Sequence, residues 1–203
     1  MPSEPPRRRN AAFTRAAILQ SAIQHFARAG YDGAGVRDIA TDAGVTAMLV
    51  NRYFGSKEKL FAEAVETSFA TPVFIASESE DLARDIAAAL AVHSAPGAES
   101  VSAFLIMLRS VSNPAAVRIV RAALARHAGR RLSDQLPEPG RLLRSDVALA
   151  VMSGVLLMRQ VIGTRALSRS SADELETLLE SVFSAVFDTP LDSRGDAPRT
   201  GED

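Results

Sequence analysis

The segment from Val36 to Phe54 constrains the fold of this chain more than any other. Its sequence, VRDIATDAGVTAMLVNRYF, contains two short stretches with helical spacing that are separated by Gly44. Gly44 can adopt the positive φ that a tight turn requires, and Ala40 is small where two helices would approach most closely. The expected inward-facing positions are apolar: Ile39, Val45 and Val50. The segment therefore predicts a helix-turn-helix, although a purely structural helical hairpin would share some of these features.

The rest of the chain carries helix signals of the same kind and no strand alternation longer than a few residues. Gly30 is placed to cap a first helix, Ser56 and Asn113 to begin later ones, and Ser171 with Glu174 forms a capping box. We expect about nine helices, over residues 12–29, 36–43, 47–53, 57–70, 78–92, 99–111, 114–132, 142–165 and 172–187. The fold class is therefore all-α, with an N-terminal three-helix unit followed by a larger helical domain.

The composition of the chain excludes several kinds of site and segment. The 203 residues include no cysteine, which excludes disulfides and thiolate metal sites and suits a reducing cytoplasm. No stretch reaches the roughly 18 apolar residues of a membrane-spanning helix, and Arg7–Arg9 precede no apolar signal segment. Proline- and charge-rich ends predict a disordered arm over 1–11 and a disordered tail over 189–203, which leaves domains at 12–56 and 57–188.

Charge is distributed unevenly along the chain. The formal net charge is −1, yet residues 1–59 carry nine Lys or Arg against five Asp or Glu, a net of +4. A basic N-terminal quarter on an acidic body is typical of a chain in which one end meets phosphates, although chance clustering would also produce it.

The outward side of residues 46–53 favours DNA as the partner. Met48 lies beside Ala47 and Leu49 on a face that would otherwise be solvated, and such apolar groups can contact thymine methyls in the major groove. Asn51 could read adenine or contact a phosphate, and Arg37 could reach a phosphate or a guanine. The expected DNA-contacting residues are Arg37, Thr46, Ala47, Met48, Leu49, Asn51, Arg52, Tyr53 and Lys57.

The stretch from Arg15 to Val65 resembles the DNA-binding domain of the TetR family. The most specific portions are A-G-Y-D-G, V-R-D-I-A, A-G-V and R-Y-F-G-S-K-E-K-L. The resemblance implies a transcriptional repressor that acts as a homodimer on a palindromic operator and is released by a small molecule. Asn51 stands where the family usually has Tyr or His, and Gly35 stands where Ser or Thr often caps the second helix.

The C-terminal body is expected to bind an effector and to dimerise. Val147–Met158 carries no charge on any side, so this helix needs cover all round, which a dimer interface supplies. We expect helices 142–165 and 172–187 to pair with their copies in a four-helix interface; a purely intramolecular core is the alternative.

A ligand pocket is expected between the central helices and the long helix. Methionine adapts to irregular shapes, and the expected lining is Phe104, Met107, Leu108, Met152 and Leu156, with Met158 beside them. Such residues are also ordinary core. Arg109 and Arg159 fall within apolar helices, where each could pair with a ligand anion or form a salt bridge at a domain edge.

Two other classes of function are weaker. An enzyme is not expected, because His25, His93 and His127 are far apart in the sequence and no nucleophile or zinc motif accompanies them. No cofactor and no metal are expected for the same reason. A helical interaction protein without DNA affinity is the second alternative, and salt-dependent binding to duplex DNA would separate it from a regulator.

Overall fold

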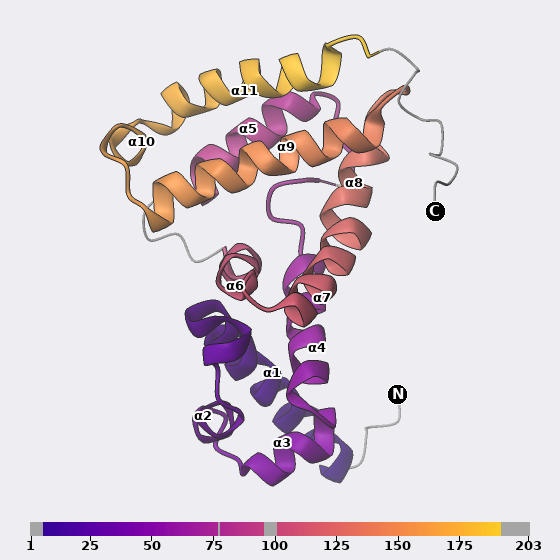
Figure 1. The fold of residues 1–203 in the computed structure, drawn as a ribbon, viewed down its shortest axis with the longest axis vertical. Helices are drawn as coiled ribbons and strands as arrows, with labels where there is room; N and C mark the ends of the chain where they lie inside the picture. Colours follow the sequence, from indigo (N-terminus) through magenta and orange to yellow (C-terminus); the bar gives the residue numbers. More distant parts are fainter. Residues whose placement is uncertain (1–5, 77, 96–100, 192–203) are drawn as a thin grey trace, which may run out of the picture. The chain divides into compact units, whose positions relative to one another are not determined.

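The computed structural model describes residues 6–76, 78–95 and 101–191, and these residues form helices and loops without strands (Figure 1). The all-α expectation is confirmed. The chain divides into two compact units, each made of two segments: Met1–Thr71 with Val101–Leu124, and Pro72–Ser100 with Ala125–Asp203. The units are described separately below, and neither is contiguous in sequence.

The first unit contains the predicted helix-turn-helix and four further helices. Its helices are α1 (Pro6–Gly33), α2 (Val36–Asp42), α3 (Ala47–Phe54), α4 (Lys57–Ala70), α6 (Ser102–Ser110) and α7 (Pro114–Leu124). Their core is apolar and nearly solvent-free, with Ile18, Phe26, Ile39, Leu60, Phe61 and Ile106 fully buried. Phe61 packs edge-on against both Phe26 and Tyr31 at centroid distances of 4.9 Å. The core therefore joins α1 and α4 behind the helix-turn-helix.

Helix α1 begins earlier than the sequence indicates. It starts at Pro6 rather than near Ala12, because proline is tolerated in the first helical turn, where its missing N–H is not needed. Near its other end, Gly30 adopts φ 69° and ψ −176°, which kinks the chain; this ψ is not that of the predicted left-handed cap, and helical backbone resumes and runs to Gly33. Residues 1–5 of the expected arm and 192–203 of the expected tail lie outside the described residues.

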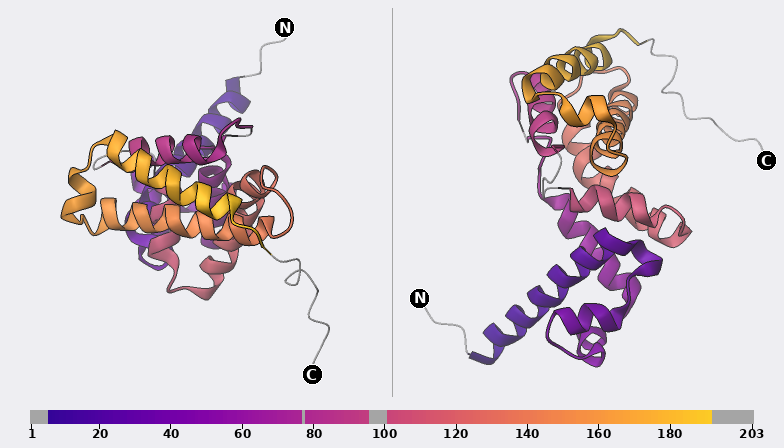
Figure 2. Two further views of the ribbon diagram at one scale, coloured as in Figure 1. Left: turned by 90° about the horizontal axis from the view of Figure 1, so that it is seen from above. Right: turned by 90° about the vertical axis from the view of Figure 1, so that its left-hand side faces the viewer.

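The second unit is a small bundle. It contains α5 (Leu82–His93), η1 (Ala125–Gly129), α8 (Arg130–Ser133), α9 (Arg141–Leu156), η2 (Leu157–Val161), α10 (Arg165–Arg169) and α11 (Ala172–Asp188). Helices α5, α9 and α11 lie side by side, and α10 joins α9 to an antiparallel α11 (Figures 1 and 2). Their facing sides bury apolar groups, among them Ile86, Leu90, Ala148, Leu179 and Phe183.

Two features of this unit differ from the expected helices. The segments η1 and η2 are π-helical turns within stretches that the pattern predicts as continuous α-helix. The long helix predicted over 142–165 stops near Val161, because Gly163 adopts φ 69°, and a separate α10 follows. The sequence pattern continues past Gly163 and does not predict that the helix ends there.

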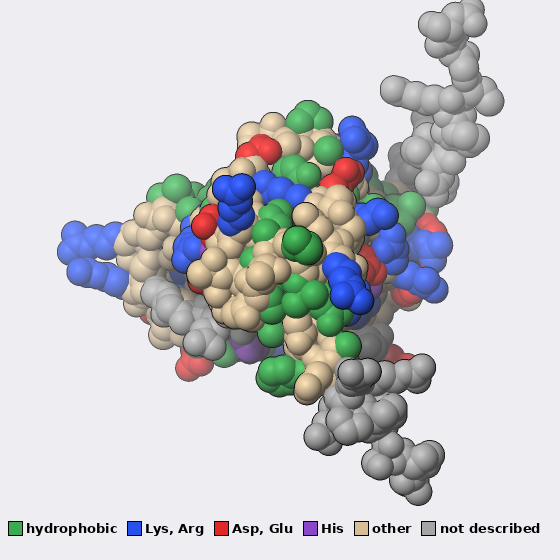
Figure 3. Space-filling view, turned by 90° about the horizontal axis from the view of Figure 1, so that it is seen from below, with side chains coloured by type: hydrophobic (Ala, Val, Ile, Leu, Met, Phe, Trp, Pro, Cys, Tyr) green, Lys and Arg blue, Asp and Glu red, His purple; other side chains and the backbone are tan. Residues whose placement is uncertain are grey.

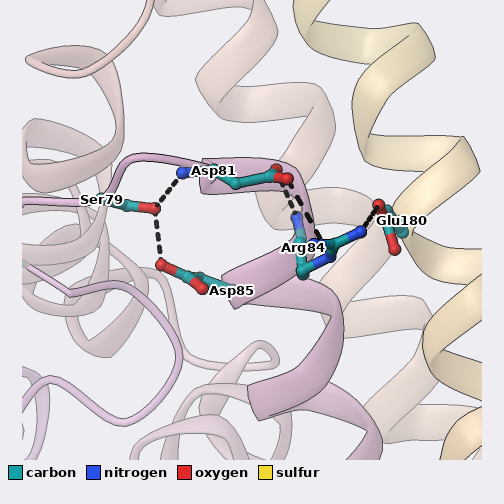
Figure 4. Close-up of polar contacts among 5 residues, drawn as sticks. All are labelled: Ser79, Asp81, Arg84, Asp85 and Glu180. Atoms are coloured by element: carbon teal, nitrogen blue, oxygen red, sulfur yellow. Dashed lines mark hydrogen bonds and ion pairs between the residues drawn. The ribbon is translucent and has the colours of Figure 1, made fainter.

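Helix caps in this unit largely follow local rules. The capping box of Ser171 and Glu174 at α11 is confirmed. Helix α5 begins at Leu82, later than predicted, because the carboxylate of Asp81 accepts a hydrogen bond from the backbone N–H of Arg84 at 3.1 Å. The guanidinium of Arg84 then donates to Glu180 of α11 at 3.2 Å, and Ser79 donates to Asp85 (Figure 4). The Glu180 carboxylate raises the pKa of Arg84. This exposed network ties the start of α5 to α11.

Candidate nucleic-acid interface

The helix-turn-helix is held by a small apolar core beneath α2 and α3. Ile39, Ala40 and Val50 are buried, and Val45 is half-buried against the same cluster. Gly44 has φ 68° in the turn between the two helices. These inward positions and the positive φ at Gly44 match the sequence-based prediction. The outer side of α3 is consequently fixed relative to α1 and α4.

Polar contacts fix α2 against α1, and the sequence pattern did not reveal them. Ser21 of α1 donates its hydroxyl to the carbonyl of Ile39 at 3.0 Å. The buried ring of His25 contacts the Asp42 carboxylate through Nε2, and Arg28 lies 3.2 Å from its Nδ1. Asp42 is the last residue of α2, so this contact anchors that helix just before the turn. His25, which the sequence offered only as an isolated histidine, is a positioning residue here.

The outward side of α3 divides into exposed and half-buried side chains. Met48 is 81% exposed, and Arg37, Thr46, Asn51 and Arg52 are also exposed. Ala47 and Tyr53 are half-buried and pack against the core, so they face outward less fully than expected. Leu49 is half-buried as well. Thr46 caps α3 by accepting a hydrogen bond from the Leu49 N–H at 3.3 Å.

Figure 3 views the molecule from the end that carries α2 and α3. Hydrophobic side chains lie near the centre of this face, and both basic and acidic side chains lie around them. A solvated apolar side chain as exposed as Met48 is unfavourable unless another surface covers it. The exposure of Met48 on this face is compatible with the predicted contact to thymine methyls in a major groove.

Lys57, which the sequence predicts to contact a phosphate, is held by contacts within its own unit. Its Nζ lies 4.9 Å above the ring centroid of Tyr31 and donates to the carbonyl of Asp32 at 3.4 Å. Burial, followed by the charges of Glu58 and Asp32, raises the pKa of Tyr31. The predicted N-cap at Ser56 is confirmed, since its side chain accepts from the Lys59 N–H at 3.2 Å. Lys57 therefore links the start of α4 to the bend after α1.

That bend is also fastened to α6 and α7 within the same unit. The Tyr31 N–H donates to Ser110 Oγ at 3.0 Å, and Asn113 Nδ2 donates to Asp32 Oδ1 at 2.8 Å. Gly30 packs so closely against the backbone of Arg109 that an added Cβ would lie 2.0 Å from the Arg109 carbonyl oxygen. We call Gly30, Tyr31, Asp32, Arg109, Ser110 and Asn113 the α1–α6 joint.

The expected ligand-lining residues fall into two groups. Phe104 is buried and Met107 and Leu108 are half-buried on α6 of the first unit, whereas Met152 and Leu156 are buried on α9 of the second. An open groove of about 420 Å³ lies in the second unit and involves none of these residues. It is lined by residues of α9, α11 and the following turn: Leu143, Arg144, Val147, Val182, Ala185, Val186, Thr189 and Leu191.

Two further features, a metal-ligand cluster and a membrane-spanning helix, are not found in the described part of the chain. No group of three His, Cys, Asp or Glu side chains there is arranged to hold a metal ion. Within the same residues, no helix is both long enough and apolar enough to cross a membrane.

Sequence comparisons identify both parts of the chain. Residues 18–64 match the family described as bacterial regulatory proteins, tetR family. Residues 80–186 match the tetracyclin repressor-like C-terminal domain. A curated relative, the HTH-type transcriptional repressor NicS of Pseudomonas putida, is 38% identical over 58 residues, which are 29% of this chain and 27% of NicS. The chain thus matches only about a quarter of that relative's length.

Solved structures share the fold over most of the chain. A TetR-family regulator from Streptomyces coelicolor is 24% identical with a TM-score of 0.55, covering 87% of this chain and 96% of its own. A TetR-family regulator from Rhodococcus is 19% identical with a TM-score of 0.65, covering 87% and 99%. The multidrug binding protein EbrR, solved with ethidium, is 20% identical with a TM-score of 0.62, covering 88% and 99%.

Proposed function

The chain belongs to the TetR family of bacterial transcriptional regulators, and from this premise we propose that it is a homodimeric repressor released from a palindromic operator by a small molecule. One observation carries the proposal. The outward side of α3 presents an exposed Met48 beside exposed Asn51 and Arg52, on a helix whose other side is locked by Val50 and Phe54. Such a rigid helix can enter a major groove without rearrangement.

The proposed contacts divide into base reading and phosphate binding. Met48, with Ala47 and Leu49, meets thymine methyls, and Asn51 reads adenine or holds a phosphate. Arg37 and Arg52 are exposed cations that can reach phosphates, with Arg37 also able to read a guanine. Thr46 places the start of α3, where the helix dipole is positive, near the DNA backbone. Tyr53 and Lys57 complete the set through phosphate contacts.

Dimerisation is proposed through α9 and α11. The uncharged stretch of α9 has one buried side and one exposed side. Ala148, Met152 and Leu156 are buried, whereas Val147 remains 40% exposed. Exposed apolar side chains continue onto both helices and the turn that follows α9: Leu142, Leu143, Met158, Val161, Ile162, Leu178 and Val182. Together with the open groove, they form an apolar surface of the kind that a second copy would cover.

The dimer proposal has a matched pair of variants. Val182 on α11 is 42% exposed and Val92 on α5 is 57% exposed, so glutamate can be accommodated at either position. Val182→Glu places two like charges within the proposed interface and should shift the protein to monomer in analytical ultracentrifugation. Val92→Glu should leave the dimer intact. Dissociation by both variants, or by neither, would contradict an α9–α11 interface.

Effector action is proposed to change the spacing of the two recognition helices. A dimer that holds them about 34–36 Å apart matches one turn of DNA. Helix α4 follows α3 directly and packs on α1, α6 and α7, so it is the proposed lever. The effector must bind the non-DNA-binding state more tightly, because equal affinity for both states shifts nothing. A regulator of this kind works beside the chromosome, which implies the cytoplasm, and needs no catalytic activity.

Selection of bound sequences from random duplex DNA is the first test. We expect a palindrome, and we expect the logarithm of affinity to fall linearly with the logarithm of salt concentration. Met48→Glu should abolish this binding, because a carboxylate would face the groove. Val111→Glu, at another exposed apolar position of the same unit, should retain it. Recovery of no palindrome, or equal loss by both variants, would refute the proposed interface.

A further inference from the structure

Arg159 is a buried cation with no acidic partner among the residues that the structure describes. Its side chain lies in η2 and is only 4% exposed. Nη1 donates to the carbonyl of Ala91 at 2.6 Å and to Ser94 Oγ at 2.9 Å, while Nε has no hydrogen-bond partner. Among the described residues no carboxylate forms an ion pair with it, so the salt bridge considered from the sequence is not found there.

Such a residue is costly to retain. An isolated charge in a protein interior is strongly unfavourable unless it is paired, and burial lowers the pKa of Arg159. The carbonyls at the end of α5 offset part of this cost, because a helix C-terminus carries partial negative charge. Capping alone does not require a guanidinium, however, since the neighbouring Gln160 already donates to the carbonyls of His93 at 3.2 Å and Ala95 at 3.3 Å.

The surroundings of Arg159 suit a ligand with an apolar body. Met152, Leu156 and Arg159 follow one another at spacings of four and three, which places them on one buried face of α9 and η2. The fully buried hydroxyl of Ser94 stands beside the guanidinium. The local backbone is a π-helical turn, with the Ile162 N–H donating to the Leu157 carbonyl at 2.9 Å, and such turns often occur at functional sites. A few polar groups converging within an apolar interior are typical of a small-molecule site.

Arg144 provides an internal comparison. It is 5% exposed, its Nη1 donates to the Val186 carbonyl at 2.8 Å near the end of α11, and its Nε also lacks a partner. Unlike Arg159, it lines the open groove on the surface proposed to meet a second copy. The proposed second copy would therefore cover Arg144, whereas no described residue supplies a hydrogen-bond partner for Arg159 Nε.

We propose that Arg159 is the anion-binding residue of the effector site, and that the effector is an organic acid with an apolar body. A carboxylate would accept two hydrogen bonds from the Nε edge of the guanidinium, which lies away from the backbone-bonded Nη1. Its apolar part would lie along the face that carries Leu156 and Met152. This inference rests on the proposed effector-controlled function and adds the chemical class of the ligand.

Thermal denaturation of the full chain with matched acid and amide ligands tests the inference. The probes are alkyl carboxylates from butyrate to octanoate and the aromatic acids benzoate and naphthoate, each compared with its primary amide at millimolar concentration. We expect acids to raise Tm and their amides to do so far less, with an affinity ratio of about tenfold to a hundredfold for a charge-assisted contact. Arg159→Gln should remove the preference for acids, and Arg159→Lys should weaken it.

Two controls separate this inference from other outcomes. Arg165→Gln removes an exposed arginine from the same unit and should keep the full preference. Equal Tm shifts for acids and amides, no shift with any acid, or an acid preference that survives Arg159→Gln would overturn the inference. Operator binding without ligand is measured in parallel. A protein that binds its operator but shows no acid preference contradicts the effector class alone, whereas failure to bind any operator contradicts the proposed function.

Discussion

The α1–α6 joint gives the sharpest quantitative prediction, through the pair Gly30→Ala and Gly44→Ala. Both glycines have nearly the same positive φ, 69° and 68°. They differ in their surroundings, because a Cβ at Gly30 would lie 2.0 Å from the Arg109 carbonyl oxygen, whereas a Cβ at Gly44 would meet nothing within 4 Å. The pair therefore compares a backbone cost alone with a backbone cost plus a steric clash inside one compact unit.

The expected magnitudes follow from these geometries. At Gly44, alanine in a left-handed conformation should reduce the free energy of unfolding by about 1–2 kcal/mol. At Gly30, the combination of φ 69° and ψ −176° lies in a region essentially restricted to glycine, which adds about 1–3 kcal/mol of strain. Displacing the backbone of Arg109 should cost about 1–3 kcal/mol more. Gly30→Ala is thus the more damaging change, by about 2 kcal/mol.

Urea unfolding followed by far-UV circular dichroism measures the difference. All three proteins are compared at one protein concentration, because dimerisation contributes to apparent stability. If the Gly30→Ala protein does not fold and the Gly44→Ala protein does, the result also supports the prediction, because the loss of stability at Gly30 is then the larger one. Equal losses at the two positions would refute the close approach of Gly30 to α6 and with it the joint.

Three further perturbations test other contacts. Lys57→Ala should reduce the slope of log affinity against log salt by about 1 at every operator sequence, whereas a loss confined to one sequence would make Lys57 a base-reading residue. Asn113→Ala removes the N-cap of α7 and should cost about 1 kcal/mol in urea unfolding, while Asn113→Ser should recover much of it. Hydrogen bonds from Ser171 lower the pKa of Glu174, so their stabilisation is present above the ordinary glutamate pKa and is lost as pH falls through the lowered value. The Tm difference between wild type and Glu174→Gln should therefore shrink on acidification, and a constant difference would contradict this contact.

Local signals explain why much of the fold could be read from the sequence. Gly44, Ser56 and Asn113 act within a few residues of themselves, as turn or cap, and each does so in the structure. The exposed side of α3 also follows from local periodicity, because burying Val50 and Phe54 leaves Met48 and Asn51 outside.

Contacts that depend on tertiary approach could not be read in the same way. His25 meets Asp42 from 17 positions away, and Tyr31 meets Ser110 from 79 positions away. Nothing local marks either member of these pairs. The expected ligand lining has the same limit, because apolar periodicity is identical for a core and for a pocket. The π turn that carries Arg159 likewise has no signal in the spacing of apolar residues.

The order of elements along the chain connects the proposed effector residue to the DNA-binding face. Arg159 binds the last turn of α5, and the next helix in the chain is α6, whose end is fastened to Gly30 and Tyr31 in the joint. Tyr31 in turn holds Lys57 at the start of α4. We hypothesise that an anion bound at the Nε edge of Arg159 changes how its Nη1 holds the last turn of α5. Thermodynamic linkage then requires operator DNA to lower the affinity for the acid by the same factor that the acid lowers the affinity for the operator. An acid affinity unchanged by saturating operator would show that the two sites are not coupled, even if each binds its own ligand.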